Sequence, residues 1–274
     1  MRIDKLAGAL GAYVSDLDVA AAIGSDDLFA ELCAALNEHQ VLVLRDAHIT
    51  PHEQRALALK FGPIEGHPAY DVVAGTGDVQ ILESTREKPS KIELWHSDMT
   101  FRPEPPMLTM LHGKVIPPYG GDTLFASMTA AYDALSAGMQ RFLDGLTARH
   151  DFAHGFKESL AEPGGYERLK GALEANPPVD HPVVRTHPVT GRRALYVNVL
   201  FTVRINELTA AESQAVLELL FRHAVRDEFT ARVTWQPETL VMWDNRATQH
   251  KPVNDFFPQH RRMHRVTVAG DRPC

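Results

Sequence analysis

The spacing of hydrophobic residues along the chain predicts four amphipathic helices. Apolar side chains recur every three or four positions in these segments, which span residues 25–40, 51–61, 129–146 and 209–226. Ser25 and Thr129 are the expected N-caps of the first and third helix, because a hydroxyl oxygen can accept a hydrogen bond from a free N–H group of the first turn. Gly62 and Pro63 are expected to end the second helix.

Short apolar runs predict strands between and after these helices. The expected strands span residues 41–46, 107–115, 122–128, 194–198, 239–245 and 262–270. Strands and helices do not alternate regularly along the chain, which argues against a doubly wound parallel sheet. The pattern favours a mainly β protein with flanking helices and a double-stranded β-helix (jelly-roll) core.

One domain is expected to contain the whole chain. Its 274 residues fit a single barrel or sandwich with insertions, and no repeat or linker divides residues 1–274. Residues 155–180 differ from the rest, because they have the pattern of a loop with one short helical piece. We expect this segment to form a mobile cover over the active site.

Composition and charge narrow the classes of partner. The chain is 44% hydrophobic and 23% charged, as is typical of a globular protein with a sizeable core. A formal net charge of −7 without a Lys/Arg run argues against a nucleic-acid partner. No apolar run approaches the roughly 20 residues that span a bilayer, and no signal-peptide pattern begins the chain. Two cysteines, Cys33 and Cys274, are too few for a disulfide framework, so we expect a cytoplasmic protein.

His96, Asp98 and His250 are the candidate metal ligands, in the motifs WHSDMTF and WDNRATQHKP. In an extended segment, residues i and i+2 point to the same face, so His96 and Asp98 can bind one ion while Ser97 points away. The third ligand, His250, would come from a distant strand. Two histidines and one carboxylate form the facial triad that holds Fe(II) and leaves positions for O2 and a bidentate 2-oxo acid.

Other interpretations of these three residues stay open at this point. A His-x-Asp pair is common by chance, so it could belong to a solvated surface turn, and the distant histidine could be a structural residue at the barrel end. Two histidines and a carboxylate also suit zinc, so a zinc-dependent hydrolase is an alternative class. A third class is a non-catalytic jelly-roll binding protein, although such a protein needs no open metal face.

Two arginines near the C-terminus indicate an acidic cosubstrate beside the metal. Arg261 follows His250 by eleven residues, and Arg265 shares its face of the expected strand. A guanidinium group binds a carboxylate through paired, charge-assisted hydrogen bonds, and the hydroxyl of Thr123 can add another. The competing interpretation is that both arginines are solvated charges at the barrel edge.

Together, these motifs resemble the taurine/2,4-D dioxygenase family of Fe(II)- and 2-oxoglutarate-dependent oxygenases. The resemblance extends from about residue 41 to residue 272 and rests on WHSDMTF, PPYGGDTLFASM, HPVVRTHPVTG, WDNRATQH and HRRMHRVTVAGD. It implies a jelly-roll core in which His96, Asp98 and His250 bind iron.

The same resemblance implies the cosubstrates and the assembly. Thr123 and Arg261 would hold 2-oxoglutarate, and Arg265 would help to hold it or would bind an anionic primary substrate. O2 would be the second cosubstrate. Enzymes of this family are commonly oligomers, so a homodimer or homotetramer is expected.

Within the family, the chain most resembles the taurine dioxygenases, through the segments VRTHPVTGRRALYVN, FTVRI and GHPAY. This similarity implies that His67 and Arg265 bind a sulfonate. It also implies that Tyr70 lies near the substrate amine and that Phe156 and Phe201 line the pocket. The competing interpretation is that the aromatic residues simply pack in the core and that His67 is an ordinary loop residue.

One position departs from the taurine enzymes. They have an asparagine near the substrate amine, four residues before the first iron-binding histidine, where this chain has Ile92. Isoleucine cannot hydrogen-bond an ammonium group, and burying that cation without partners is costly. The expected reaction hydroxylates the carbon next to sulfur in taurine or a related organosulfonate, releasing sulfite and an aldehyde with succinate and CO2. Ile92 raises the alternative that an alkanesulfonate or an alkyl sulfate ester is the substrate.

Overall fold

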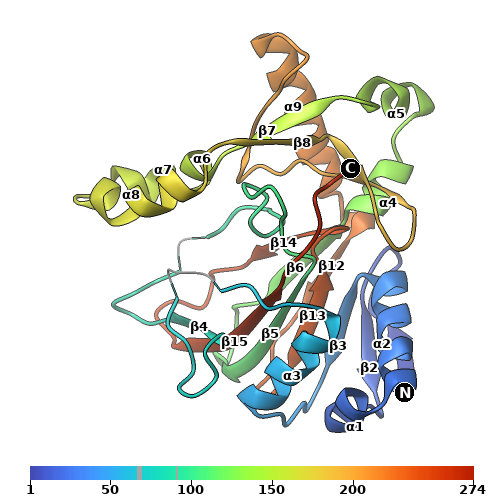
Figure 1. Ribbon diagram of the computed structural model, residues 1–274, viewed down its shortest axis with the longest axis vertical. Helices are drawn as coiled ribbons and strands as arrows, with labels where there is room; N and C mark the ends of the chain where they lie inside the picture. The colour runs from blue at the N-terminus through green and yellow to red at the C-terminus, as the bar shows by residue number, and fades with distance from the viewer. Residues whose placement is uncertain (67–69, 91) are drawn as a thin grey trace.

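A seven-stranded sheet is the largest layer of the computed structural model, which describes residues 1–66, 70–90 and 92–274 (Figure 1). The strand order is β1-β2-β3-β13-β5-β15-β4, and all neighbours pair antiparallel except β2 and β3. The strands span Arg2–Lys5 (β1), Ala12–Ser15 (β2), Val41–Leu44 (β3), Leu240–Asp244 (β13), Leu108–Val115 (β5), Arg261–Val268 (β15) and Gln80–Ser84 (β4). Segments far apart in the sequence therefore lie side by side.

A second sheet, of strand order β12-β6-β14, packs against one face of the first. Its strands span Thr230–Val233 (β12), Thr123–Ser127 (β6) and Thr248–Pro252 (β14). Side chains alternate between the two faces of a strand, so the inward residues of both sheets meet. Val43 and Trp243 of the large sheet share a buried cluster with Phe125 and Val233 of the small one. This two-sheet core with flanking helices is the jelly roll that the sequence pattern predicts.

Helices cover the other face of the large sheet (Figure 1). They span Val19–Gly24 (α1), Asp26–His39 (α2) and Pro51–Phe61 (α3). The Ser25 hydroxyl caps α2, and α3 begins with a capping box in which Thr50 and Glu53 each accept a backbone hydrogen bond from the other. The first two predicted helices are therefore confirmed.

The third predicted helix is wrong, because the chain forms two shorter helices in its place. They span Met128–Asp133 (α4) and Ala137–Leu143 (α5). Ser127, rather than Thr129, caps the first, and Ser136 caps the second. Each serine hydroxyl accepts a hydrogen bond from the backbone N–H three residues further on, so the chain starts a new helix after an interruption.

Residues 155–180 are mostly helical, whereas the sequence pattern predicts a loop with only one short helical piece. The helices there span Phe152–Gly155 (α6), Lys157–Ala161 (α7) and Gly165–Ala175 (α8), and they lie to one side of the two sheets (Figure 1). Leu169, Ala172 and Leu173 of α8 pack against a buried aromatic cluster. These residues recur at helical spacing, so the helix has an apolar face to bury.

The remaining elements form a further layer beyond the two sheets (Figure 1). They span Thr147–His150 (β7), Val179–Pro182 (β8), Val184–Thr186 (β9), Arg193–Leu195 (β10), Thr202–Ile205 (β11), Ala210–Ala224 (α9) and Asp227–Phe229 (η1). A capping box between Thr209 and Glu212 begins α9, which confirms the fourth predicted helix. Within the described part of the chain, no helix combines the length and hydropathy that crossing a membrane requires.

Candidate active site

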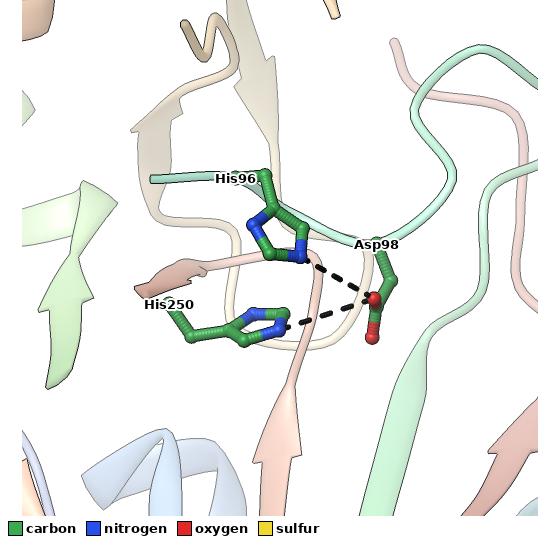
Figure 2. Close-up of side chains that lie close together, drawn as sticks. All are labelled: His96, Asp98 and His250. Atoms are coloured by element: carbon green, nitrogen blue, oxygen red, sulfur yellow. Dashed lines mark ion pairs between the residues drawn. The ribbon is translucent and has the colours of Figure 1, made fainter. Parts of the chain in front are cut away.

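The structure brings the three predicted metal ligands together (Figure 2). His250 lies in β14, and His96 pairs with it through two backbone hydrogen bonds of 3.0 and 2.8 Å. Asp98 lies in the turn that follows His96. One candidate ligand atom from each residue lies within 4.8 Å of the other two, and all three residues are buried. The solvated-turn interpretation of this motif is therefore wrong.

The Asp98 carboxylate is oriented so that one oxygen faces both imidazoles. Its Oδ1 lies 3.9 Å from Nε2 of His96 and 3.9 Å from Nε2 of His250 (Figure 2). Its Oδ2 accepts a 2.7 Å hydrogen bond from the hydroxyl of Thr109 in β5. Sequence reasoning missed Thr109, since only the strand arrangement brings it to this carboxylate. The result is one carboxylate oxygen and two imidazole nitrogens directed at a common point.

The protonation states of these groups suit a metal ion. Nδ1 of His96 lies 2.8 Å from the carbonyl oxygen of Leu94, so Nδ1 carries the proton and Nε2 keeps its lone pair. Burial lowers the pKa of His96 and lowers the pKa of His250 to about 3, so both imidazoles are neutral. Burial alone would raise the pKa of Asp98, but Arg265 and the two histidines hold it well below its usual range. Two neutral imidazoles and one carboxylate are donors that Fe(II) accepts.

Backbone contacts fix the position of Asp98. Asn245 Oδ1 accepts a 2.6 Å hydrogen bond from the Asp98 N–H, and Asn245 Nδ2 donates to the carbonyl oxygens of Asp98 (3.1 Å) and Pro106 (2.9 Å). The Ser97 hydroxyl donates to a backbone carbonyl of β14 and so points away from the ligands. Met99 has a φ of 47°, so the chain turns sharply after the carboxylate. Asn245 lies in the same motif as His250, and this proximity is the sequence signal that could have assigned it to the site.

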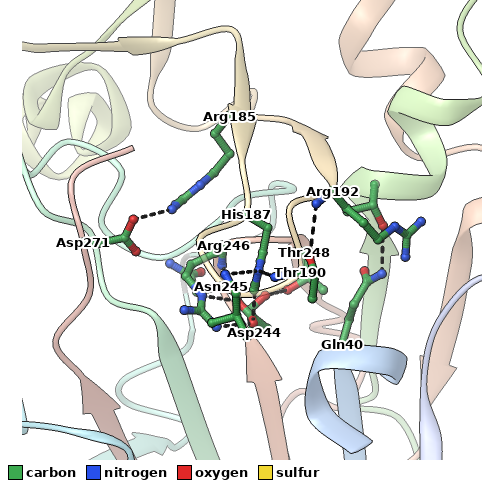
Figure 3. Close-up of polar contacts among 12 residues, drawn as sticks. Gln40, Arg185, His187, Thr190, Arg192, Asp244, Asn245, Arg246, Thr248 and Asp271 are labelled. Carbon is green, nitrogen blue, oxygen red and sulfur yellow. Dashed lines mark hydrogen bonds and ion pairs between the residues drawn. The ribbon is translucent and has the colours of Figure 1, made fainter. Parts of the chain in front are cut away.

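A buried ionic network anchors the segment that carries Asn245 (Figure 3). The Asp244 carboxylate accepts hydrogen bonds from Nε2 of His187 at 2.9 Å and from two nitrogens of Arg246 at 2.9 and 2.7 Å. Nδ1 of His187 accepts two backbone N–H groups of its own loop, so its proton is on Nε2. Burial alone would raise the pKa of Asp244, but Arg246 and His187 hold it well below its usual range.

Thr123 and Arg261 lie around the indole of Trp235. Trp235 Nε1 donates a 3.0 Å hydrogen bond to the Thr123 oxygen, which leaves the hydroxyl proton available to another acceptor. The Arg261 guanidinium lies 5.6 Å from the Trp235 ring centroid and 5.9 Å from that of Phe256. Its Nε is buried and has no hydrogen-bond partner in the described residues, and burial lowers its pKa to about 10. A guanidinium with an unpaired buried N–H, together with a free hydroxyl proton, fits a bound carboxylate.

Arg265 connects this region with the metal ligands. One of its terminal nitrogens lies 3.0 Å from Asp98 Oδ1. The residue is only 8% exposed, so the interpretation of Arg265 as a solvated barrel-edge charge is wrong. Its Nε is buried and has no hydrogen-bond partner among the residues that the structure describes.

A buried apolar cluster adjoins the metal ligands. It contains Met99, Phe101, Phe152, Leu200 and Phe201. The Phe201 ring centroid lies 6.4 Å from that of His96, and the Phe156 centroid lies 6.4 Å from that of Phe201. Ile92 and Phe156 pack against this cluster together with the apolar face of α8. Phe156 and Phe201, the two aromatic residues predicted to line the pocket, therefore share one apolar wall with Ile92.

Of the other two predicted substrate contacts, the structure describes Tyr70, which precedes β4. Tyr70 is half-buried and lines a surface hollow together with Asp71, Ile81 and Lys88. His67 lies outside the described residues, so its expected contact with the substrate anion stays a prediction.

The fold and these two neighbouring sites define the class of non-haem iron enzymes that use a 2-oxo acid. A family model described as "Taurine catabolism dioxygenase TauD, TfdA family" matches residues 2–267, and the chain belongs to this family. It is an alpha-ketoglutarate-dependent dioxygenase whose cofactor is Fe(II) and whose cosubstrates are 2-oxoglutarate and O2. Family membership excludes the zinc hydrolase and the non-catalytic binding protein.

Individual relatives have different substrates in their names. The chain is 34% identical to an alkylsulfatase of Acinetobacter baylyi, over 99% of this chain and 86% of that protein. It is 33% identical to the alpha-ketoglutarate-dependent 2,4-dichlorophenoxyacetate dioxygenase of Cupriavidus pinatubonensis, over 95% of this chain and 94% of that protein. A crystal structure of a taurine dioxygenase from Burkholderia xenovorans matches with a TM-score of 0.84 and 33% identity, over 99% of this chain and 90% of that protein. This match confirms the predicted fold. The primary substrate therefore has to be argued from this chain's own pocket.

Proposed function

We propose that this enzyme oxidises the carbon that carries a sulfonate or sulfate ester group in an anionic organosulfur compound with an apolar body. Hydroxylation makes that carbon unstable, so the C–S bond of a sulfonate or the C–O bond of a sulfate ester breaks. The products are an aldehyde with sulfite or sulfate, while 2-oxoglutarate becomes succinate and CO2. Bound Fe(II) supplies the activation of O2. The single observation that carries the proposal is the position of Ile92 in the apolar cluster beside the metal ligands.

The metal and cosubstrate roles follow from the free atoms of each side chain. His96 and His250 would bind Fe(II) through Nε2, and Asp98 would bind it through the oxygen that faces both rings. Thr123 and Arg261 would hold the far carboxylate of 2-oxoglutarate, because the hydroxyl proton and the buried Arg261 Nε–H are both available to it.

The substrate would lie between a cation and the apolar cluster. Arg265 would bind the anionic sulfur group, with His67 as the expected second contact. Ile92, Phe156 and Phe201 would contact the carbon body, and none of these side chains can hydrogen-bond an ammonium group. Taurine places a cation near this wall, whereas a simple alkyl chain places apolar surface there. The alkylsulfatase relative adds support for a substrate with an alkyl body.

Two helices are candidates for a cover over this pocket. The apolar face of α8 packs on the cluster that contains Phe201, and α7 precedes it. A segment placed there would exclude water while the substrate carbon is oxidised. We propose that residues 155–180 cover the bound substrate in this way. Tyr70, which precedes β4, is also proposed as a substrate contact.

The decisive experiment compares three substrates with the Fe(II)-loaded enzyme, 2-oxoglutarate and O2. Taurine, hexanesulfonate and hexyl sulfate are supplied separately, and released sulfite, released sulfate and succinate are measured. We expect turnover of hexanesulfonate or hexyl sulfate at a higher kcat/KM than that of taurine. Sulfite identifies the sulfonate as substrate and sulfate identifies the ester. A higher kcat/KM for taurine, or no release from any of the three, would contradict the proposal.

A variant can test the observation on which the proposal rests. Ile92→Asn returns a hydrogen-bonding side chain to the apolar wall, so it should raise kcat/KM for taurine relative to the hexyl compounds. Leu94→Asn makes the same kind of change at an exposed position two residues further on and should leave that ratio unchanged. An unchanged ratio in Ile92→Asn would mean that this residue does not contact the substrate body.

Assembly and location are further parts of the proposal. The chemistry needs ferrous iron, and the two cysteines are unpaired, so a reducing compartment such as the cytoplasm suits the enzyme. A homodimer or homotetramer is proposed by analogy with the family. Light scattering of the purified enzyme would test it, and a monomeric mass at micromolar concentration would contradict it.

A further inference from the structure

A fully buried amide lies in the sheet without any hydrogen-bond partner. Gln80, the first residue of β4, is 1% exposed. Both polar atoms of its side chain, Nε2 and Oε1, are buried and have no partner within the described residues. An unsatisfied buried polar group destabilises the folded state unless something binds it. This amide is therefore expected to have a partner that is not part of the chain.

Strand pairing places Gln80 beside the anion-binding arginine. β4 and β15 are antiparallel neighbours, and Gln80 lies directly opposite Arg265. Residues directly opposite each other in an antiparallel pair point to the same face of the sheet. That face carries Met263 of β15 and Leu82 of β4, which pack in the core between the two sheets. The Gln80 amide thus lies on the side of the sheet where Arg265 contacts Asp98.

Other donors on this face are also unpaired. The Nε of Arg265 and the hydroxyl of Thr267, which is two residues further along β15, are buried and without a partner in the described parts of the chain. Thr267 lies opposite Thr109, the residue that holds the Asp98 carboxylate. The unpaired groups of this patch include N–H and O–H donors, and Arg265 also contacts the Asp98 carboxylate. A patch of this kind suits an oxyanion that accepts several hydrogen bonds.

We propose that Gln80 is a specificity-determining residue that binds the anionic sulfur group of the substrate together with Arg265. Nε2 of Gln80 donates a hydrogen bond to an oxygen of the sulfonate or sulfate ester, and Oε1 accepts a hydrogen bond from a neighbouring donor such as Thr267 or Arg265 Nε. A sulfur group presents three terminal oxygens to these donors, whereas a carboxylate presents two. The inference rests on the proposed function, because it names the group that occupies this position.

The experiment measures two binding reactions on the same metal-loaded protein. Gln80→Met keeps the size of the side chain and removes both polar atoms, and Gln80→Glu adds a negative charge. Hexyl sulfate and hexanesulfonate are titrated by calorimetry into the anaerobic enzyme with Mn(II) and 2-oxoglutarate. Binding of 2-oxoglutarate to the Mn(II) enzyme is measured separately. We expect hexyl-compound affinity to fall roughly tenfold in Gln80→Met and further in Gln80→Glu, with 2-oxoglutarate affinity unchanged.

A matched control lies on the other face of the same sheet. Gln54 of α3 is also fully buried and also has an unpaired Oε1, but it packs on the helix-covered face and donates to a backbone carbonyl of β15. Gln54→Met should therefore leave both affinities unchanged. This control separates loss of a ligand contact from a general effect of removing a buried amide.

The outcomes separate the two proposals. Wild-type affinity for the sulfur compounds in Gln80→Met would overturn the role of Gln80, because a bound water would then be its partner. Weaker 2-oxoglutarate binding in Gln80→Met, without weaker substrate binding, would also overturn it and assign the amide to the cosubstrate. Failure of the wild-type enzyme to bind either hexyl compound would instead overturn the proposed function, and this proposal with it.

Discussion

The metal end of the active site and its anion-binding end differ in how completely their polar groups are paired. At the metal end, the backbone N–H, the carbonyl oxygen and the Oδ2 of Asp98 all have hydrogen-bond partners, supplied by Asn245 and Thr109, and Nδ1 of His250 is an exception without a partner in the described residues. At the anion-binding end, Arg261, Arg265 and Gln80 each have a buried donor without a partner in the described residues.

This difference separates what stabilises the fold from what awaits a ligand. A paired buried group contributes to stability, and losing its partner costs about 1–3 kcal/mol or more when a charge is involved. An unpaired buried donor that faces the ligand site can gain its partner from the ligand, so its removal should weaken binding and leave the fold intact. Substitutions at the two ends should therefore give opposite patterns of stability and affinity.

The largest effect is expected in the network behind the metal end. Asp244→Asn should lower the free energy of unfolding by about 3–5 kcal/mol, because it leaves Arg246 buried without its anion. Urea unfolding at pH 7 measures this value. A loss below about 1 kcal/mol would show that the network does not stabilise the fold, and the comparison between the two ends would fail.

The same carboxylate predicts a pH dependence. The pKa of Asp244 is lower in the folded state than in the unfolded chain, so its contribution to stability is present above the unfolded pKa of about 4. That contribution is lost as pH falls through the folded value. Wild-type stability should therefore fall more steeply below about pH 4 than that of Asp244→Asn. Parallel curves would contradict the assignment.

At the anion-binding end, Arg261→Leu should weaken 2-oxoglutarate binding by roughly 10–100-fold, since it removes charge-assisted hydrogen bonds. Its free energy of unfolding should stay equal or rise, because a charged group with an unpaired buried N–H is removed. Calorimetric titration of 2-oxoglutarate into the Mn(II) enzyme and urea unfolding measure the two quantities. Arg262→Leu, the next residue on β15, is the matched control and should retain 2-oxoglutarate affinity. Destabilisation of Arg261→Leu without weaker binding would reverse the interpretation.

The sequence predicts one end of the site better than the other. His96 and Asp98 lie two residues apart, and His250 lies in a recognisable motif, so local spacing reveals the ligands. Thr109 and Gln80 reach the site only through the strand order of the large sheet, and no local pattern marks them. The register of β4 against β15 depends on the fold as a whole, so this part of the site needs the structure.

Two misjudged segments have a similar cause. The interruption between α4 and α5 keeps helical spacing of apolar residues on both sides, and only the serine caps distinguish two helices from one. The sequence pattern predicts residues 155–180 as a loop with one short helical piece, but the irregular part between α7 and α8 is limited to residues 162–164. In both segments, periodicity detects helices and capping residues decide where each begins.

A smaller effect is expected from the side chain that holds the Asp98 backbone. Asn245→Leu removes three hydrogen bonds and should lower Fe(II) affinity by about tenfold, the lower range for residues that orient metal ligands. Binding of Mn(II) or Fe(II) under anaerobic conditions measures it. Raising the Fe(II) concentration should restore much of the turnover. Wild-type metal affinity in this variant would show that the turn after His96 holds Asp98 without help.

The smallest effect tests the indole between the two cosubstrate residues. Trp235→Phe keeps an aromatic ring beside Arg261 but removes the N–H that occupies a lone pair of Thr123. The Thr123 hydroxyl can then rotate, so KM for 2-oxoglutarate should rise about 2–10-fold, the range of one ordinary hydrogen bond. Trp243→Phe is the matched control, because the Trp243 N–H is buried without a partner in the described residues and its loss should not weaken 2-oxoglutarate binding. Equal KM values for 2-oxoglutarate in both variants would mean that Arg261 alone orients the cosubstrate carboxylate. Thr123 would then belong with the residues whose hydrogen bonds stabilise the fold and do not bind the cosubstrate.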